Sequence, residues 1–129
     1  MEKVEVVLSL ERLKKAYSRL VEAVDKVEDE LDRDGAIQRF EFTVELLWKT
    51  LKRFLAYEKV ECYSPRDCVK KAFRFGLIGD YEILLDMLED GNRSSHIYSQ
   101  EEAEKIFERI SKVYVKSIRK VISKLENRL

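Results

Sequence analysis

Apolar residues recur every three or four positions along most of the chain, the spacing that gathers them on one face of an α-helix. The first run of this kind is an unbroken seam with charged residues on the other faces: Leu10, Leu13, Tyr17, Leu20, Val24, Val27 and Leu31. The polar run at residues 32–35 ends in Gly35, a residue typical of turns. We therefore predict one long amphipathic helix that ends there.

The second predicted helix runs from about Ala36 to Tyr57, and apolar residues occupy several of its faces. The seam and the residues that widen it are Ile37, Phe40, Val44, Leu47, Leu51 and Phe54, with Phe42, Leu46, Trp48 and Leu55. Such a helix is expected to lie centrally and to contact several neighbours. A polar line also follows it, made of Gln38, Glu41, Glu45 and Lys49. This line either is a solvated edge, with Glu45 and Lys49 paired one turn apart, or faces a cleft.

Two shorter helices are predicted next. Ser64 and Pro65 are favoured at a helix start, and Gly76 ends the run. Inward positions are expected at Val69, Ala72 and Phe73. The outer face carries the densest positive patch, which either is merely solvated or binds an anionic partner: Arg66, Lys70, Lys71 and Arg74. Asp80 is predicted to cap the fourth helix, whose inward residues are Tyr81, Leu84, Leu85 and Leu88.

The last helix is predicted to run from Ser99 to about Asn127, because Ser99 and Glu102 form a capping box. It carries two apolar lines. The first contains Ala103, Ile106, Ile110, Val113 and Ser117, and the second contains Phe107, Tyr114, Ile118, Val121 and Leu125. Two lines suggest two packing partners, one of them in a second copy, so we expect a two-fold homodimer.

Composition supports an all-α fold, since the 129 residues contain only four glycines and one proline. We predict a single domain over residues 1–129, an up-and-down bundle of about five helices, three long and two short.

Equal numbers of basic and acidic residues, 25 each, argue against avid duplex nucleic-acid binding. Cys62 and Cys68 lack zinc-site spacing and are expected to be reduced thiols. Neither a membrane span nor a signal peptide is visible, so a cytoplasmic location is expected.

The longest polar interruption, residues 90–99, contains the only histidine, His96. A helix N-terminus follows it and disfavours the imidazolium, so a neutral ring could accept a hydroxyl proton. The free N–H groups of that helix and the guanidinium of Arg93 could hold a phosphate. A base and phosphate-binding groups of this kind could support metal-independent RNA cleavage, in which His96 deprotonates the 2′-hydroxyl. With one histidine we expect no metal and no other cofactor. The alternative is a histidine with a purely structural hydrogen bond.

Three stretches resemble a known family: residues 38–49, the helix start at Ser64, Pro65 and Arg66, and the segment from Asp90 through Asn92 to His96 and Tyr98. Together they are similar to the small HEPN-domain proteins called nucleotidyltransferase substrate-binding proteins, over about residues 8–125. The resemblance implies a helical bundle that forms two-fold dimers and works with a separately encoded minimal nucleotidyltransferase, often as a toxin–antitoxin pair.

The resemblance also implies site roles. Many members cleave RNA with an arginine and a histidine that meet across the dimer, and in some pairs the nucleotidyltransferase adds AMP to the tyrosine two residues after the histidine. Those roles fall on His96 and Tyr98, and Asn92 matches the polar residue after the family arginine. The arginine itself is missing, because the three positions where the pattern expects it are Glu89, Asp90 and Gly91. Arg93 is closer to the histidine than the pattern requires.

Three functions follow as hypotheses. The chain is a partner subunit that presents substrate, or the Tyr98 hydroxyl, to a nucleotidyltransferase. Alternatively, it is a metal-independent RNase in which Arg93 assists His96. Without the family arginine, which would stabilise transition-state charge, we expect that activity to be weak. A third alternative is a nucleotide-binding bundle without catalysis.

Overall fold

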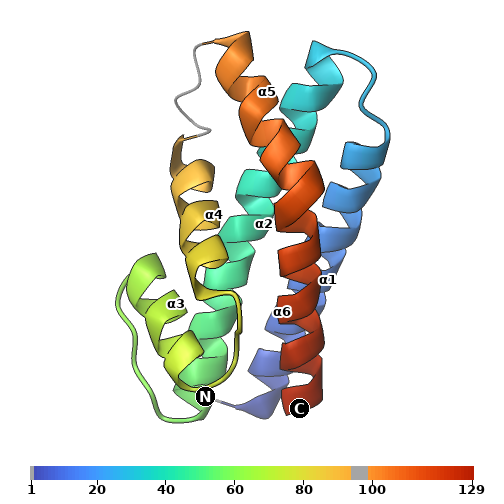
Figure 1. Cartoon of the computed structure of the whole chain (residues 1–129). Coiled ribbons are helices and arrows are strands. Elements are labelled where there is room, and N and C mark those ends of the chain that lie inside the picture. Colours follow the sequence, from blue (N-terminus) through green and yellow to red (C-terminus); the bar gives the residue numbers. More distant parts are fainter. Residues whose placement is uncertain (1, 94–98) are drawn as a thin grey trace.

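A computed structural model describes residues 2–93 and 99–129, and the described residues form helices and no strands (Figure 1). The helices are α1 (Lys3–Asp25), α2 (Glu30–Tyr57), α3 (Pro65–Arg74) and α4 (Tyr81–Arg93), followed by α5 (Gln100–Arg109), the π-helical turn η2 (Ile110–Tyr114) and α6 (Val115–Arg128). Since α5, η2 and α6 are contiguous, they form one long helix. The predicted bundle of three long and two short helices is confirmed.

Helix α2 is central, as its broad apolar surface predicts, because it contacts α1, α3, α4 and α5. Its principal partner is the antiparallel α1 (Figure 1). Buried polar contacts join these two helices. The hydroxyls of Ser9 and Thr50 lie 2.9 Å apart. The Thr43 hydroxyl donates to the Arg39 carbonyl of its own helix at 2.7 Å and also lies 3.4 Å from the Ala16 carbonyl of α1. Around these pairs the interface is aliphatic and aromatic, which supplies most of the stabilising burial.

The predicted boundary between the first two helices was wrong. Helix α1 ends at Asp25 and α2 already begins at Glu30, so the polar run at residues 32–35 is helical. The N-cap is Asp29, whose carboxylate accepts the backbone N–H of Asp32 at 2.8 Å. Leu31 was assigned to the first seam, but it lies in the first turn of α2 and is 79% exposed. Gly35 is tolerated within a helix at modest cost.

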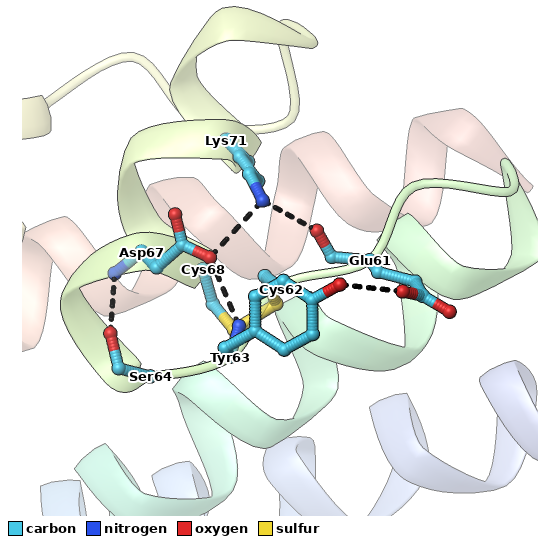
Figure 2. Close-up of polar contacts among 7 residues, drawn as sticks. All are labelled: Glu61, Cys62, Tyr63, Ser64, Asp67, Cys68 and Lys71. Carbon is cyan, nitrogen blue, oxygen red and sulfur yellow. Dashed lines mark hydrogen bonds and ion pairs between the residues drawn. A yellow bond between two sulfur atoms is a disulfide. The ribbon is translucent and has the colours of Figure 1, made fainter.

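The prediction of reduced cysteines was also wrong, because Cys62 and Cys68 form a disulfide (Figure 2). After α2 the chain reverses, with the Val60 N–H bonded to the Leu55 carbonyl at 2.8 Å. This reversal sets Cys62 beside the first turn of α3, with its Cα 5.0 Å from that of Cys68, a separation that suits a disulfide. The lack of zinc-site spacing does not exclude a single disulfide that closes a short loop, which is the pairing seen here.

Several side-chain orientations differ from those expected. Phe73 was expected inside but is exposed, and its ring stacks on Tyr81 at 5.2 Å between centroids. Phe42 and Val113, both placed on apolar seams, are exposed. The caps predicted at Ser64 and Ser99 are confirmed: the Ser64 hydroxyl accepts the N–H of Asp67, and the Ser99 hydroxyl accepts the N–H of Glu102. The cap predicted at Asp80 stays a prediction.

The π-helical turn η2 explains the two apolar lines of the last helix. A π-turn contains one extra residue and so rotates everything after it around the helix axis. Up to Ile110, the first residue of η2, the buried residues belong to the first line: Ala103, Ile106 and Ile110. From Tyr114, the last residue of η2, they belong mainly to the second line: Tyr114, Ile118, Val121 and Leu125. One buried face therefore accounts for most of both lines within one subunit, and the homodimer remains a prediction that rests on the resemblance.

Candidate functional site

A cleft of 380 Å³ lies between α2, the start of α3 and the end of α4, and we call it the interhelical cleft. It gathers residues from three predicted sets that are distant in sequence. Glu41 and Glu45 come from the polar line of α2, Arg66 from the basic face of α3, and Asn92 from the polar segment before His96. Two of the four residues of the polar line therefore line this cleft, and one of the four basic residues lines the same space.

The α2 wall of the cleft centres on Trp48 and Glu45. The Trp48 indole N–H donates to the Glu45 carboxylate at 3.1 Å, and the Lys49 ammonium lies 3.1 Å from the other carboxylate oxygen. The hydrogen bond from Trp48, with smaller help from Lys49, lowers the pKa of Glu45 despite partial burial. The predicted pairing of Glu45 with Lys49 is therefore present, and Glu45 presents a fixed negative charge to the cleft.

The α3 wall is held by a dense set of local bonds around the disulfide (Figure 2). The Asp67 carboxylate accepts the Tyr63 N–H at 3.0 Å, and the Lys71 ammonium contacts both Asp67, at 3.2 Å, and the Glu61 carbonyl, at 2.7 Å. The hydrogen bond from Tyr63 is the main cause of the lowered pKa of Asp67. Ser64, Pro65 and Arg66, which line the cleft, lie in the loop that the disulfide closes.

This arrangement divides the predicted basic face of α3. Arg66 lines the interhelical cleft, and Lys71 is engaged by Asp67 and the Glu61 carbonyl. Lys70 and Arg74 are exposed and do not line the cleft. Only Arg66 of this face therefore lines the cleft, and anion binding by the whole face stays a prediction.

The three residues at the positions where the family pattern has an arginine lie on different sides of α4. Glu89 and Gly91 line the cleft, and a Cβ on Gly91 would sit 3.4 Å from the Val44 side chain, so α4 approaches α2 closely there. Asp90 instead is buried inside the bundle. Arg93, the predicted substitute for the arginine, is exposed at the last turn of α4, where its guanidinium lies 3.8 Å from Asp90.

Buried Asp90 is bound by two residues that sequence reasoning missed. The Arg109 guanidinium donates to both carboxylate oxygens, at 2.6 and 2.9 Å, and the Tyr114 hydroxyl donates at 2.5 Å. Burial and the hydrogen bond to Asp90 raise the pKa of Tyr114, and the same carboxylate raises that of Arg109. The sequence does contain a signal that Asp90 is buried, because Asp90 follows Leu84 and Met87 at helical spacing on the buried face of α4.

The remaining predicted residues divide into two groups. His96 and Tyr98 lie outside the described residues, so their roles stay predictions. Gln38 is on α2 but lines a different groove, toward α1, and Lys49 lies outside the cleft lining. Within the described ranges, no group of three or more histidine, cysteine, aspartate or glutamate side chains is arranged to hold a metal, and no helix is long and apolar enough to cross a membrane.

The fold and the cleft define a HEPN-type helical bundle, and comparison with known proteins specifies the family. The family described as "Nucleotidyltransferase substrate binding protein like" matches residues 8–127. The chain belongs to this family.

Two solved structures share the fold over nearly their whole length. A protein of Thermus thermophilus is 34% identical, with a TM-score of 0.80, and the match covers 88% of this chain and 98% of that one. HI0074 of Haemophilus influenzae is 28% identical, with a TM-score of 0.81, covering 91% and 98%. Its structure is described as revealing the fold of a substrate binding domain of a nucleotidyltransferase.

A curated relative adds a second functional description. The "Probable ribonuclease HepT" of Haemophilus influenzae is 36% identical over 88 residues, which are 64% of this chain. The match spans only 60% of that protein's own length.

Proposed function

We propose that this chain is a partner subunit of a separately encoded minimal nucleotidyltransferase, in a pair of the toxin–antitoxin kind. The observation that carries the proposal is family membership over residues 8–127, together with a cleft built from residues that resemble the family's motifs. The description of HI0074 as a substrate binding domain of a nucleotidyltransferase supports the same role.

The chemistry of the interhelical cleft fits a nucleotide or a nucleotide-bearing partner. The carboxylates of Glu41, Glu45 and Glu89 can accept hydrogen bonds from ribose hydroxyls and base amino groups. The Arg66 guanidinium can bind one phosphate in bidentate fashion. Trp48 offers an indole surface on the wall between them. With three carboxylates and one cation, the cleft suits a ligand of low negative charge better than a chain of phosphates.

The proposal includes Tyr98 as the acceptor of an AMP group. In that step the phenolic oxygen of Tyr98 attacks the α-phosphorus of ATP, a new phosphorus–oxygen bond forms, and pyrophosphate leaves. The phenolic proton passes to solvent or to a base on the nucleotidyltransferase. The support is the resemblance of residues 90–98 to the family motif, since Tyr98 lies outside the described residues.

Co-expression with the product of the neighbouring gene tests the partnership. We expect a stable complex by gel filtration that Arg66→Glu weakens, while Lys70→Glu, an equal charge change outside the cleft, leaves it intact. Failure to form any complex at low salt would refute the partnership. Transfer of labelled AMP from ATP to wild type but not to Tyr98→Phe would establish the acceptor. Calorimetric ATP binding by the isolated chain, without a complex, would instead favour the non-catalytic nucleotide-binding bundle.

A second candidate function, metal-independent RNA cleavage, is favoured by the relative named a probable ribonuclease. His96 would take the 2′-hydroxyl proton and Arg93 would stabilise the phosphorane charge. Arg109 is a further candidate for that charge, although Asp90 engages it on both carboxylate oxygens. The test is cleavage of RNA in the presence of a chelator by wild type, His96→Ala, Arg93→Ala and Arg109→Ala. Equal rates for wild type and His96→Ala would exclude this mechanism.

A further inference from the structure

A second groove lies between α1 and α2, and its charge is opposite to that of the interhelical cleft. Its volume is 680 Å³, and every charged residue that lines it is a cation: Arg12, Lys15, Arg19 and Arg39. We call it the basic groove. The interhelical cleft has three lining carboxylates against one arginine. A polyanion would therefore be repelled at the cleft and attracted at the groove.

Helix geometry turns these cations into a continuous row. Arg12, Lys15 and Arg19 are spaced by three and four, so they lie along one face of α1 over about 10 Å. Arg39 comes from the antiparallel α2, on the opposite side of the groove. From the sequence, the three α1 cations were only part of the charged faces of the first helix. The groove exists only because α2 packs beside them.

The four cations are not neutralised by carboxylates inside the groove. Among the described residues, none of the four forms a salt bridge within 4.0 Å. Two of these cations, Arg39 and Arg19, act on Glu22, whose carboxylate accepts a hydrogen bond from Lys26 at 3.0 Å. Lys26 is the main cause of the lowered pKa of Glu22, and Arg39 and Arg19 contribute less. The row thus presents unpaired positive charge to solvent.

An exposed aromatic ring lies in the same groove. Phe42 is 61% exposed although it belongs to the central helix α2. Half-buried Leu46 and buried Ala16 provide apolar surface beside it. A ring next to a row of cations is the combination that binds single-stranded nucleic acid, in which the cations contact phosphates and the ring stacks on an unpaired base.

We propose that the basic groove binds single-stranded nucleic acid, with Arg12, Lys15, Arg19 and Arg39 on the phosphates and Phe42 stacked on a base. A single strand is favoured over a duplex because base faces are accessible only when they are unpaired, and because the zero formal net charge does not favour duplex binding. The groove is separate from the interhelical cleft, and the inference does not depend on the function proposed for the cleft.

Fluorescence anisotropy with a short labelled oligouridylate tests the proposal on the full-length chain, and an oligothymidylate of equal length distinguishes RNA from DNA. Lys15→Glu with Arg19→Glu should weaken binding at least about tenfold. It should also reduce the slope of log affinity against log salt by about 1.4, or about 0.7 for each phosphate that the variant no longer neutralises. Lys70→Glu with Arg74→Glu makes the same charge change on α3 and should alter affinity by less than about twofold.

The aromatic contact has its own test. Phe42→Ala should weaken binding by about fivefold or more, and Phe42→Trp should restore it, because stacking contributes about 1–3 kcal/mol per base. Circular dichroism melts check that each variant is folded. The proposal is overturned if neither strand binds at low salt, if both charge-reversal pairs weaken binding equally, or if a duplex binds as tightly as the single strand. It is also overturned if polyglutamate displaces the strand and Phe42→Ala has no effect, since the groove would then bind an acidic polypeptide.

Discussion

The Asp90 carboxylate of α4 accepts two hydrogen bonds from the Arg109 guanidinium of α5, so a partly buried ion pair joins the helices on either side of residues 94–98. Asp90 occupies one of the slots where the family motif has an arginine, and it draws Arg109 to the same end of the bundle. A cation is thus present near the motif although it comes from another helix. The Tyr114 hydroxyl completes the cluster, and its ring stacks on Phe40 of α2 at 5.4 Å.

Asp90→Asn should lower the free energy of unfolding by about 2–3 kcal/mol, because a neutral amide cannot satisfy both guanidinium donors and the hydroxyl. Urea unfolding at neutral pH measures the effect as a lower midpoint with an unchanged slope. Asp86→Asn, an exposed substitution on the same helix, is the control and should change stability by less than about 0.5 kcal/mol. Equal midpoints for the two variants would contradict a stabilising role for the cluster.

The raised pKa of Tyr114 predicts a loss of stability in alkali. Its ordinary value is 10.0, and burial together with Asp90 raises the folded value, so folding favours the neutral phenol. The contribution is fully present below the unfolded pKa and is lost as pH rises above about 10. Urea midpoints should therefore fall as the pH rises from about 10 to 12, and less steeply in Tyr114→Phe, which costs about 1 kcal/mol at neutral pH. Parallel pH profiles for the two proteins would contradict the assignment.

The sequence predicted those features that depend on neighbours along one helix. Ser64 and Ser99 were recognised as caps because each bonds to an N–H three residues later. The apolar seams of α1 and α2 were likewise predicted from their periodic spacing. The boundary between these helices was predicted wrongly, because Gly35 was taken as the turn although the N-cap of α2 is Asp29.

Features that depend on a second helix could not be predicted in this way. The contact between Arg109 and Asp90 could not be predicted, because it depends on how α4 packs against the last helix. Glu41, Arg66 and Asn92 were identified separately, and only the fold brings them to one cleft. The row of cations on α1 was visible as a spacing, but its groove required the facing side of α2.

Reduction of the disulfide should destabilise the chain by about 2 kcal/mol, the loop-closure entropy of a short loop. Urea unfolding of wild type with and without a dithiol reductant measures the loss. Cys62→Ser with Cys68→Ser is the matched control, because the reductant should leave its midpoint unchanged. The local bonds of Asp67 and Lys71 should preserve the helix start, so helix content by circular dichroism should change little. A midpoint insensitive to reductant in wild type would contradict the prediction.

Deletion of Val113 should be tolerated, because it removes the extra residue of η2 from an exposed position. The last helix can then continue as a regular α-helix with the same residues buried on both sides of the deletion. Deletion of the exposed Arg119 removes one residue from regular helix and rotates Val121 and Leu125 away from the core. Each misplaced side chain should cost about 2 kcal/mol or more. Thermal melts followed by circular dichroism should therefore show a modest shift for the first deletion and a large one for the second. The reverse order would mean that η2 is required for the fold and is not a tolerated insertion.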